Sequence, residues 1–376
     1  MKSKIFILII VIISLLCIYL FSSSKDKTLI GNQTNHQLMP LVQKETTRPP
    51  KKIILLIGDG MGINHTTIGR FHLGGPNFNM GVDRMPIHGM VTNHSFNSLY
   101  IDSAASATAW ATGTRTINGF IGVDHKKRNV TNITELLATH DYISGLVATS
   151  SLTHATPAAH YAHVDSRYKE EEIASQLMTS DIRIALGGGQ EFFNLEENEN
   201  ATIILNPEQL EDKVLGSQRI IGLFAQDGIK RSVGPTQLAM SKSALSFLEK
   251  NSECGKYFLM SEGSQIDWAS HDNDLPAMLV ELADFNDTVN YMLDFASARD
   301  DVLVIVSSDH ETGGLTLLDQ EKDYVISKWN TDSHSLNQVA IYAYGPGASQ
   351  FAGKVDQTEI FPKIADLADK TSCSID

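Results

Sequence analysis

The chain has 376 residues, of which 42% are hydrophobic and 20% charged, and its formal net charge is −14. This length allows a substantial core, in one large domain or in two or three smaller ones. The acidic balance argues against a nucleic-acid-binding surface, which needs clustered Lys and Arg side chains. The far field of the protein also repels an anionic ligand, so any attraction for one must be local.

The first 24 residues (1–24) have the zones of a secretory signal. Lys2 and Lys4 precede an apolar run over residues 5–21, and a serine triplet follows. The run is at the short end for a membrane span, so we predict cleavage, with a retained membrane anchor as the alternative. Lipidation at Cys17 is disfavoured because a large residue precedes it. These features predict export to a periplasmic or extracellular location.

Residues 25–50 are polar, lack apolar periodicity and end in two prolines, a composition that predicts a flexible tether. From residue 51 onward no linker is long enough to divide the chain, so we predict a single domain over 51–376. The pattern of apolar residues is weakest at 190–235, where we expect an excursion or lid.

Two of the three cysteines, Cys254 and Cys373, lie in the predicted domain. Two cysteines do not make a disulfide framework, and their spacing does not resemble a zinc finger. They can pair in an oxidising compartment, and two unlinked thiols are the alternative.

Short, continuous apolar runs predict strands that are buried on both faces. Helical spacing of apolar residues is clearest between these runs at 237–250 and 279–295. The alternation predicts an α/β fold, a three-layer sandwich with a central, mostly parallel sheet flanked by helices. The predicted strands are Ile53–Ile57, Gly145–Ala148, Ile182–Leu186, Tyr257–Met260, Val302–Val306 and Val339–Tyr344.

Four of these strands are followed by carboxylates, imidazoles and hydroxyls. Because ligands bind beyond the carboxyl ends of the strands in open α/β sheets, we expect these side chains at one rim. So many carboxylates would repel one another unless cations lay among them. Carboxylate–imidazole sets suit zinc, and carboxylate–hydroxyl sets suit magnesium. The candidates are Asp59, His154, Thr156, Glu262, Asp267, His271, Asp309 and His310.

Each candidate has a plainer interpretation when it is taken alone. Asp59, between two glycines, is compatible with a residue that shapes a turn. Asp309 and His310 are compatible with a helix cap beside a surface histidine. Asp267 and His271 lie four residues apart, which suits two ligands of one metal on a helix or a solvated ion pair. Their occurrence together at one rim is what favours a metal site.

The small residues between Asp102 and Trp110 predict a closely packed helix that starts near Asp102 or Ser103. The free N–H groups of a helix N-terminus favour a phosphate, and a serine there can serve as nucleophile. The alternative is that Asp102 or Ser103 only caps the helix. Arg167 could hold phosphate oxygens with its planar guanidinium or form a surface ion pair.

Six motifs, in this order along the chain, resemble those of the alkaline phosphatases. The likeness runs from residue 51 to about residue 362, and the ordered set is far more specific than any of its parts. The chain is similar to a short bacterial-type member. The motifs are I-G-D-G-M-G at 57–62, D-S-A-A-S-A-T-A at 102–109, T-H-A-T-P at 153–157, E-G-S-Q-I-D at 262–267, S-D-H-E-T-G-G at 308–314 and A-Y-G-P-G at 343–347.

The resemblance implies a homodimeric enzyme that hydrolyses phosphate monoesters through a phosphoserine intermediate, with two zinc ions and one magnesium. Ser103 matches the nucleophile, and Arg167 matches the arginine that holds the phosphate. The matching metal ligands are Asp267, His271 and His334 for one zinc, Asp59, Asp309 and His310 for the other, and Asp59, Thr156 and Glu262 for magnesium.

Some positions leave the surroundings of the metals open. His334 is placed by its distance before the motif at 343–347. His154 lies where some members carry Asp, and Trp268 where others carry Lys or His, so the metal preference of the third site is undecided. About 20 residues separate Gly314 from His334, where larger members insert a surface domain. Any cap or dimer contact there is expected to be small or absent.

Other activities fit the sequence less well. Related phosphodiesterases and nucleotide pyrophosphatases usually use a threonine nucleophile and lack the third metal site, whereas this chain has Ser103, Thr156 and Glu262. A sulfatase needs a Cys or Ser followed two residues later by Pro, and that position is Ala105. An inactive phosphate- or metal-binding protein would leave gaps in the ligand set, and here every matching position is filled.

Overall fold

The computed structural model describes most of the chain. In this part, no helix is long and apolar enough to cross a membrane. The predicted signal or anchor at residues 1–24 lies outside the described residues. The described ranges are 25–32, 38–43, 48–195, 201–210 and 218–373.

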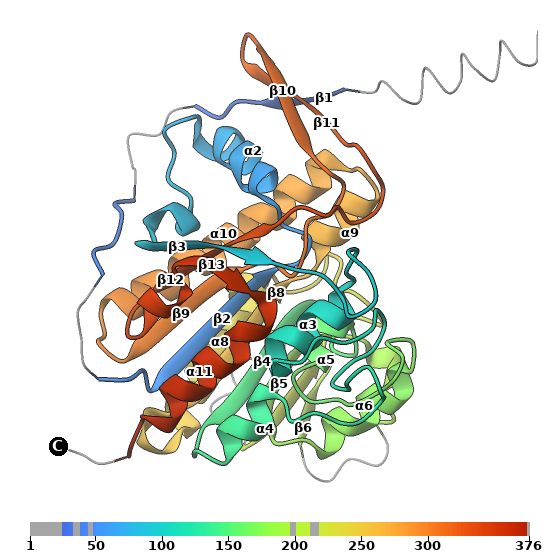
Figure 1. The fold of residues 1–376 in the computed structure, drawn as a ribbon, viewed down its shortest axis with the longest axis vertical. Helices are drawn as coiled ribbons and strands as arrows, with labels where there is room; N and C mark the ends of the chain where they lie inside the picture. Colours follow the sequence, from blue (N-terminus) through green and yellow to red (C-terminus); the bar gives the residue numbers. More distant parts are fainter. Residues whose placement is uncertain (1–24, 33–37, 44–47, 196–200, 211–217, 374–376) are drawn as a thin grey trace, which may run out of the picture.

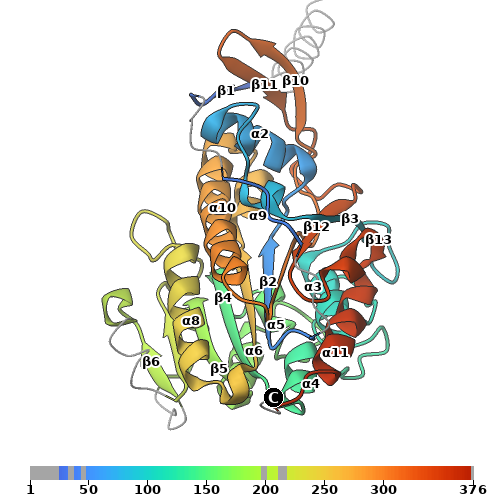
Figure 2. The same cartoon turned by 90° about the vertical axis from the view of Figure 1, so that its left-hand side faces the viewer.

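A ten-stranded sheet runs through the molecule with helices on both faces (Figures 1 and 2). Seven neighbouring strands are parallel, and one strand near the other end is antiparallel to both of its neighbours. The predicted three-layer α/β sandwich is therefore confirmed. The strand order is β13 (Gly353–Asp356), β3 (Ile87–Thr92), β12 (Val339–Tyr344), β9 (Val302–Ser307), β2 (Lys52–Gly58), β8 (Tyr257–Gly263), β4 (Ile143–Ser151), β5 (Ile182–Gly188), β7 (Ile220–Leu223) and β6 (Thr202–Ile204).

The central strands are apolar on both sides because both faces of the sheet are covered. In β2, Ile53, Leu55 and Ile57 pack into the core on one face, while Ile54 and Leu56 pack into the core on the other. Successive side chains of a strand point to opposite faces, so a strand between two helical layers reads as a continuous apolar run.

Two sets of helices form the outer layers (Figure 2). The two longest helices in the described part of the chain contain the stretches at 237–250 and 279–295 that the apolar spacing predicted. One face carries α3 (Ser103–Thr112), α4 (Ile133–Ala138), α5 (Ala155–Ala158), α6 (Glu170–Thr179) and α11 (Ile360–Asp369). The other carries α2 (Ile63–Gly74), α8 (Gln237–Asn251), α9 (Gln265–His271) and α10 (Leu275–Ser297).

The segment 25–50, predicted as a flexible tether, contributes a strand, so the prediction is wrong for part of it. β1 (Asp26–Leu29) pairs with β11 (Tyr324–Lys328), which also pairs with β10 (Thr316–Glu321). This small sheet projects from the body of the molecule (Figure 1). The strand is held mainly by backbone hydrogen bonds, which any sequence can supply, so its side chains carry little apolar periodicity.

Strands also occur in two segments whose apolar pattern is weak. Within the stretch 190–235, predicted as an excursion or lid, the described residues add β7 and the edge strand β6 to the main sheet. The short segment between Gly314 and His334 forms the β10–β11 hairpin, which matches the small surface element expected there.

Cys254 and Cys373 form a disulfide between residues 119 apart in sequence. The bond joins the segment after α11 to the turn before β8. Of the two alternatives for these cysteines, the structure therefore contains the paired one.

Replacing Cys373 by Ser is expected to lower the free energy of unfolding by about 2–4 kcal/mol, because a cross-link between distant residues restricts the unfolded chain. Urea unfolding followed by circular dichroism measures the difference. Dithiothreitol should move the wild-type midpoint to that of the variant and leave the variant unchanged. Equal midpoints for the oxidised wild type and the variant would contradict the prediction.

Candidate active site

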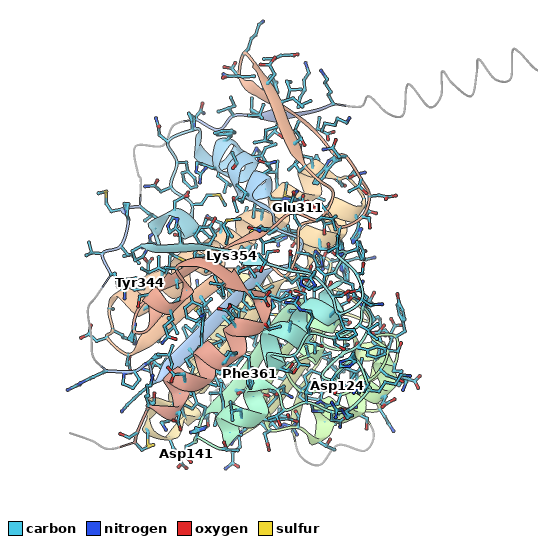
Figure 3. All side chains as sticks on the ribbon, viewed as in Figure 1. Asp124, Asp141, Glu311, Tyr344, Lys354 and Phe361 are labelled. Carbon is cyan, nitrogen blue, oxygen red and sulfur yellow. A yellow bond between two sulfur atoms is a disulfide. The ribbon has the colours of Figure 1, made fainter. Side chains whose placement is uncertain are left out.

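The carboxyl ends of four adjacent parallel strands, β9, β2, β8 and β4, meet at one edge of the sheet. In Figure 3, Glu311 lies at this edge, and Asp141, which precedes β4, lies at the opposite one. The candidate residues are far apart in the sequence, and the order of the strands in the sheet brings them together. The side chains gathered here are Asp59 after β2, Glu262 in β8, Asp309 and His310 after β9, and His154 and Thr156 after β4.

Three groups of these side chains have ligand atoms within 4.8 Å of one another, close enough to hold a metal ion. The first and second groups contain the residues matched to the two zinc ions. The third shares Asp59 with the second, so these two lie side by side. The groups are Asp267, His271 and His334; Asp59, Asp309 and His310; and Asp59, His154 and Glu262.

In the first group, backbone carbonyls determine which imidazole nitrogen is available. Nδ1 of His271 lies 2.6 Å from the carbonyl oxygen of Asp332, and Nδ1 of His334 lies 2.7 Å from that of Ile101. A carbonyl only accepts, so each Nδ1 carries a hydrogen and each neutral ring presents a lone pair at Nε2. The two Nε2 atoms are 3.2 Å apart, with the Asp267 carboxylate 3.5 and 3.8 Å away. Two facing lone pairs need a proton or a cation between them, so this group fits a metal.

The second group is fully buried. Asp59, Asp309 and His310 are each at most 1% exposed. Burial raises the pKa of Asp59 well above its usual value, and repulsion from Asp309 raises it further. Neither carboxylate oxygen of Asp59 has a hydrogen-bond partner among the described residues. Because a buried charge must be paired or bound to a cation, these oxygens fit a metal shared by two sites.

Around the third group, further oxygens are left without partners. Thr156 Oγ1 and Glu262 Oε1 are buried and accept or donate no hydrogen bond within the described part of the chain. Burial raises the pKa of Glu262 to about 7, while Ser264 donates to its other oxygen at 2.7 Å. A hydroxyl and two carboxylates from Asp59 and Glu262 form an oxygen-rich set of the kind that magnesium prefers.

His154 makes a different contact from the others. Its Nε2 lies 2.8 Å from Nη2 of Arg167, and since a guanidinium only donates, Nε2 accepts and Nδ1 carries the hydrogen. Burial and, to a smaller extent, the charge of Arg167 lower the pKa of His154 to about 3, so the ring is neutral. Its edge packs against Trp268, 5.7 Å between ring centroids. In this arrangement His154 and Trp268 support Arg167.

The helix α3 begins at Ser103, and Asp102 is its cap. Asp102 Oδ1 accepts a hydrogen bond of 2.9 Å from the N–H of Ala105. Because Asp102 caps the helix, the hydroxyl of Ser103 is left to face the second group, with Oγ 3.2 Å from Nε2 of His310. Asp102 is therefore the helix cap, and the hydroxyl of Ser103 is not used for capping.

Arg167 lies beside the start of α3. Its Nη1 is 3.3 Å from Oδ2 of Asp102, and the same oxygen accepts a 2.9 Å hydrogen bond from the N–H of Gly119. With His154 on the other nitrogen, two contacts hold the guanidinium beside Asp102, the residue that precedes Ser103. Arg167 therefore does form an ion pair, with Asp102, and this ion pair lies within the site.

Sequence reasoning missed several supports of the ligands. Thr312 donates to the Asp267 carboxylate and lies 3.2 Å from Nδ1 of His310, so it joins the first two groups. Its only sequence signal is its place in the motif at 308–314. Ile101 and Asp332 act through backbone carbonyls, which every residue has, so nothing in the sequence could have pointed to them.

Comparison with known proteins places the chain in one family. The family model "Alkaline phosphatase" matches residues 50–213 and 197–328. The alkaline phosphatase of Escherichia coli (strain K12) is 30% identical, with 87% of this chain and 88% of the relative covered. Alkaline phosphatase 4 of Bacillus subtilis (strain 168) is 33% identical over 73% of this chain and 64% of its own length.

Solved structures agree with the sequence matches. The alkaline phosphatase from the Antarctic bacterium TAB5 superposes with a TM-score of 0.79 at 33% identity, covering 86% of this chain and 98% of that one. A variant of the TAB5 enzyme, 32% identical, has been solved with magnesium bound. The resemblance drawn from the six motifs is confirmed: the chain belongs to the alkaline phosphatase family, whose enzymes hydrolyse phosphate monoesters.

Proposed function

We propose that Ser103 is the nucleophile of this phosphatase. The observation that supports this most directly is the position of Ser103 Oγ. It lies at the N-terminus of α3, 3.2 Å from Nε2 of His310 in the second ligand group. In the first step the Ser103 O–H bond and the ester P–O bond break, the Oγ–P bond forms, and the alcohol leaves with a proton. In the second step a water O–H bond breaks as the water oxygen bonds to phosphorus, the Oγ–P bond breaks, Oγ takes up a proton, and inorganic phosphate is released.

We assign zinc to the first and second groups, which contain imidazoles, and magnesium to Asp59, Thr156 and Glu262. The support is the donor chemistry of each set and the buried oxygens that lack partners in the described chain. When bound, such ions lower the pKa of a hydroxyl or water and stabilise charge on oxygen. Asp59, common to two sets, would then hold two of the ions at a fixed separation.

The chain itself positions the phosphoryl group. Arg167 would donate to two non-bridging oxygens, and its pair of contacts to Asp102 and His154 restricts the guanidinium before substrate arrives. The N–H groups in the first turn of α3 add a positive dipole end. With a net charge of −14, the attraction for a phosphate ester has to come from this local cluster.

Replacing Arg167 by Lys is expected to raise KM for a phosphate monoester, and the inhibition constant of inorganic phosphate, about 10- to 100-fold. A point charge replaces a planar donor pair, and a hydrogen bond to a charged group contributes about 1.5–3 kcal/mol. Steady-state kinetics with 4-nitrophenyl phosphate measure both constants. A phosphate inhibition constant equal to that of the wild type would contradict the role given to Arg167.

A second substrate tests whether the enzyme prefers phosphate monoesters to phosphate diesters. Rates on 4-nitrophenyl phosphate should exceed those on bis(4-nitrophenyl) phosphate by orders of magnitude, because the site presents Arg167 and the start of α3 to free phosphoryl oxygens. Faster cleavage of the diester would assign the protein to phosphodiester hydrolysis instead.

We further propose that the protein is exported to a periplasmic or extracellular location, with residues 1–24 as signal, and acts there as a homodimer with one catalytic domain over 51–376. The Cys254–Cys373 disulfide supports an oxidising compartment. The continuous sheet supports a single domain. N-terminal sequencing of the exported form and light scattering of the purified protein test these statements; a monomer in solution would refute the dimer.

A further inference from the structure

Four consecutive residues leading into α3 each contact a different part of the site. This segment, residues 100–103, therefore connects the first ligand group, the phosphate-binding arginine and the nucleophile. The contacts are the Tyr100 ring on His334, the Ile101 carbonyl to Nδ1 of His334, the Asp102 carboxylate to Arg167, and Ser103 Oγ to His310.

The imidazole of His334 is enclosed between two other rings. The ring of Tyr100 stacks on it with centroids 5.2 Å apart and an interplanar angle of 13°. The ring of His310 lies 3.5 Å from it, at 22°. The side chain of His334 is 6% exposed, although it lies on the loop between β11 and β12 rather than in a helix or strand.

We propose that Tyr100 is a positioning residue for the metal group of Asp267, His271 and His334. Its ring holds the plane of the His334 imidazole at the angle at which Nδ1–H reaches the Ile101 carbonyl and Nε2 faces Asp267 and His271. The inference rests on the metal assignment proposed above. Partners that orient a metal-ligating histidine typically change metal affinity 10- to 100-fold when they are removed.

The hydroxyl of Tyr100 adds little to this role. It lies 3.4 Å from Oγ of Ser333, at the long end of the range for a hydrogen bond between hydroxyls. The contact with His334 is therefore made by the ring, and a phenylalanine could make it equally well.

The backbone around Tyr100 is held independently of its ring. The carbonyl of Tyr100 accepts hydrogen bonds from Asn118 Nδ2 at 3.2 Å and Ser95 Oγ at 3.3 Å. Asn118 Oδ1 also accepts from the N–H of Asp102 at 3.2 Å. Removing the ring should therefore leave the Ile101 carbonyl and the start of α3 in place and change only the packing on His334.

A matched control lies four residues earlier on the same loop. Phe96 stacks on His125 with centroids 4.0 Å apart and an interplanar angle of 5°, so it forms the same kind of pair between an aromatic ring and an imidazole. Phe96 is 52% exposed, and His125 belongs to none of the metal groups found among the described residues. Substitution of Phe96 therefore shows whether loosening of this loop is enough by itself to change zinc release.

The experiment measures zinc release from the full-length, zinc-loaded protein into a chromogenic chelator. For Tyr100→Leu we expect one zinc per chain to leave about 10-fold or more faster, while the second leaves at the wild-type rate. Tyr100→Phe and Phe96→Leu should both match the wild type. The visible spectrum of the cobalt-substituted protein should change for Tyr100→Leu only.

Unchanged release from Tyr100→Leu, equal acceleration at both sites, or equal acceleration in Phe96→Leu would each overturn the role of Tyr100. Faster release from Tyr100→Phe would overturn the role of the ring. His334→Ala separates this inference from the metal assignment itself: if that variant binds as much zinc as the wild type, His334 is not a ligand and the assignment fails first.

Discussion

Replacing Ser103 by Ala is expected to lower kcat by about three orders of magnitude or more, with the thermal unfolding temperature nearly unchanged. Alanine has no oxygen to accept the phosphoryl group, so both steps of the proposed reaction are lost. The fold should tolerate the change because Asp102, rather than Ser103, caps α3. Initial rates with 4-nitrophenyl phosphate and differential scanning calorimetry measure the two effects.

Thr112→Ala provides the control for this substitution. Thr112 is at the last turn of the same helix, and its hydroxyl donates to the carbonyl of Thr108 within the helix. Its loss should leave kcat within a few-fold of the wild type. Acid-quenched wild-type protein should carry phosphate on the peptide containing Ser103. Phosphate on another residue, or turnover by Ser103→Ala within 10-fold of the wild type, would contradict the assignment.

Removing metal with a chelator is expected to abolish activity and to destabilise the fold. A ligand that binds only the native state adds about 4.1 kcal/mol of stability when its free concentration is 1,000-fold above Kd. Its removal also leaves the buried Asp59 and Asp309 carboxylates facing each other without a cation. Thermal unfolding and metal analysis of the same samples measure the change, and added zinc should restore both activity and stability.

Asp309→Asn makes the metal prediction more specific. Without metal, the variant should be more stable than the wild type, because the repulsion between Asp59 and Asp309 is gone. With zinc the order should reverse, because the variant has lost a ligand. If the chelator does not change the unfolding temperature of the wild type, or if the two proteins keep the same order in both conditions, the second group does not hold a metal.

The central part of the fold could be predicted because it depends on local pattern. A strand covered on both faces needs an unbroken apolar run, and β2, with its five buried residues at 53–57, shows this directly. The periodicity of α8 and α10 likewise follows from one apolar stripe on each helix. Strands at the margins escaped the prediction. β1 is held by backbone pairing with β11, and β6 is a three-residue strand at the edge of the main sheet, so their side chains have little pattern to follow.

In the site, the motifs determined which residue types were available, and the structure decided what each one faces. The sequence left open whether Asp102 or Ser103 caps α3, and the hydrogen bond from Ala105 assigns the cap to Asp102. His154 belongs to the third ligand group, and the structure also places its Nε2 against Arg167. The cap is a local contact with Ala105, whereas the residue that Ser103 faces, His310, lies 207 residues away in the chain.

The sequence by itself determined the α/β class, the buried central strands and the set of carboxylates, imidazoles and hydroxyls that follow them. Only the tertiary structure decided that β9, β2, β8 and β4 are neighbours, and therefore that their ends form one site. It also decided that the carbonyls of Ile101 and Asp332 orient two histidines. The physical reason is that periodicity and caps are set by residues close in sequence, whereas strand order and the partner of a carbonyl are set by packing across the whole core.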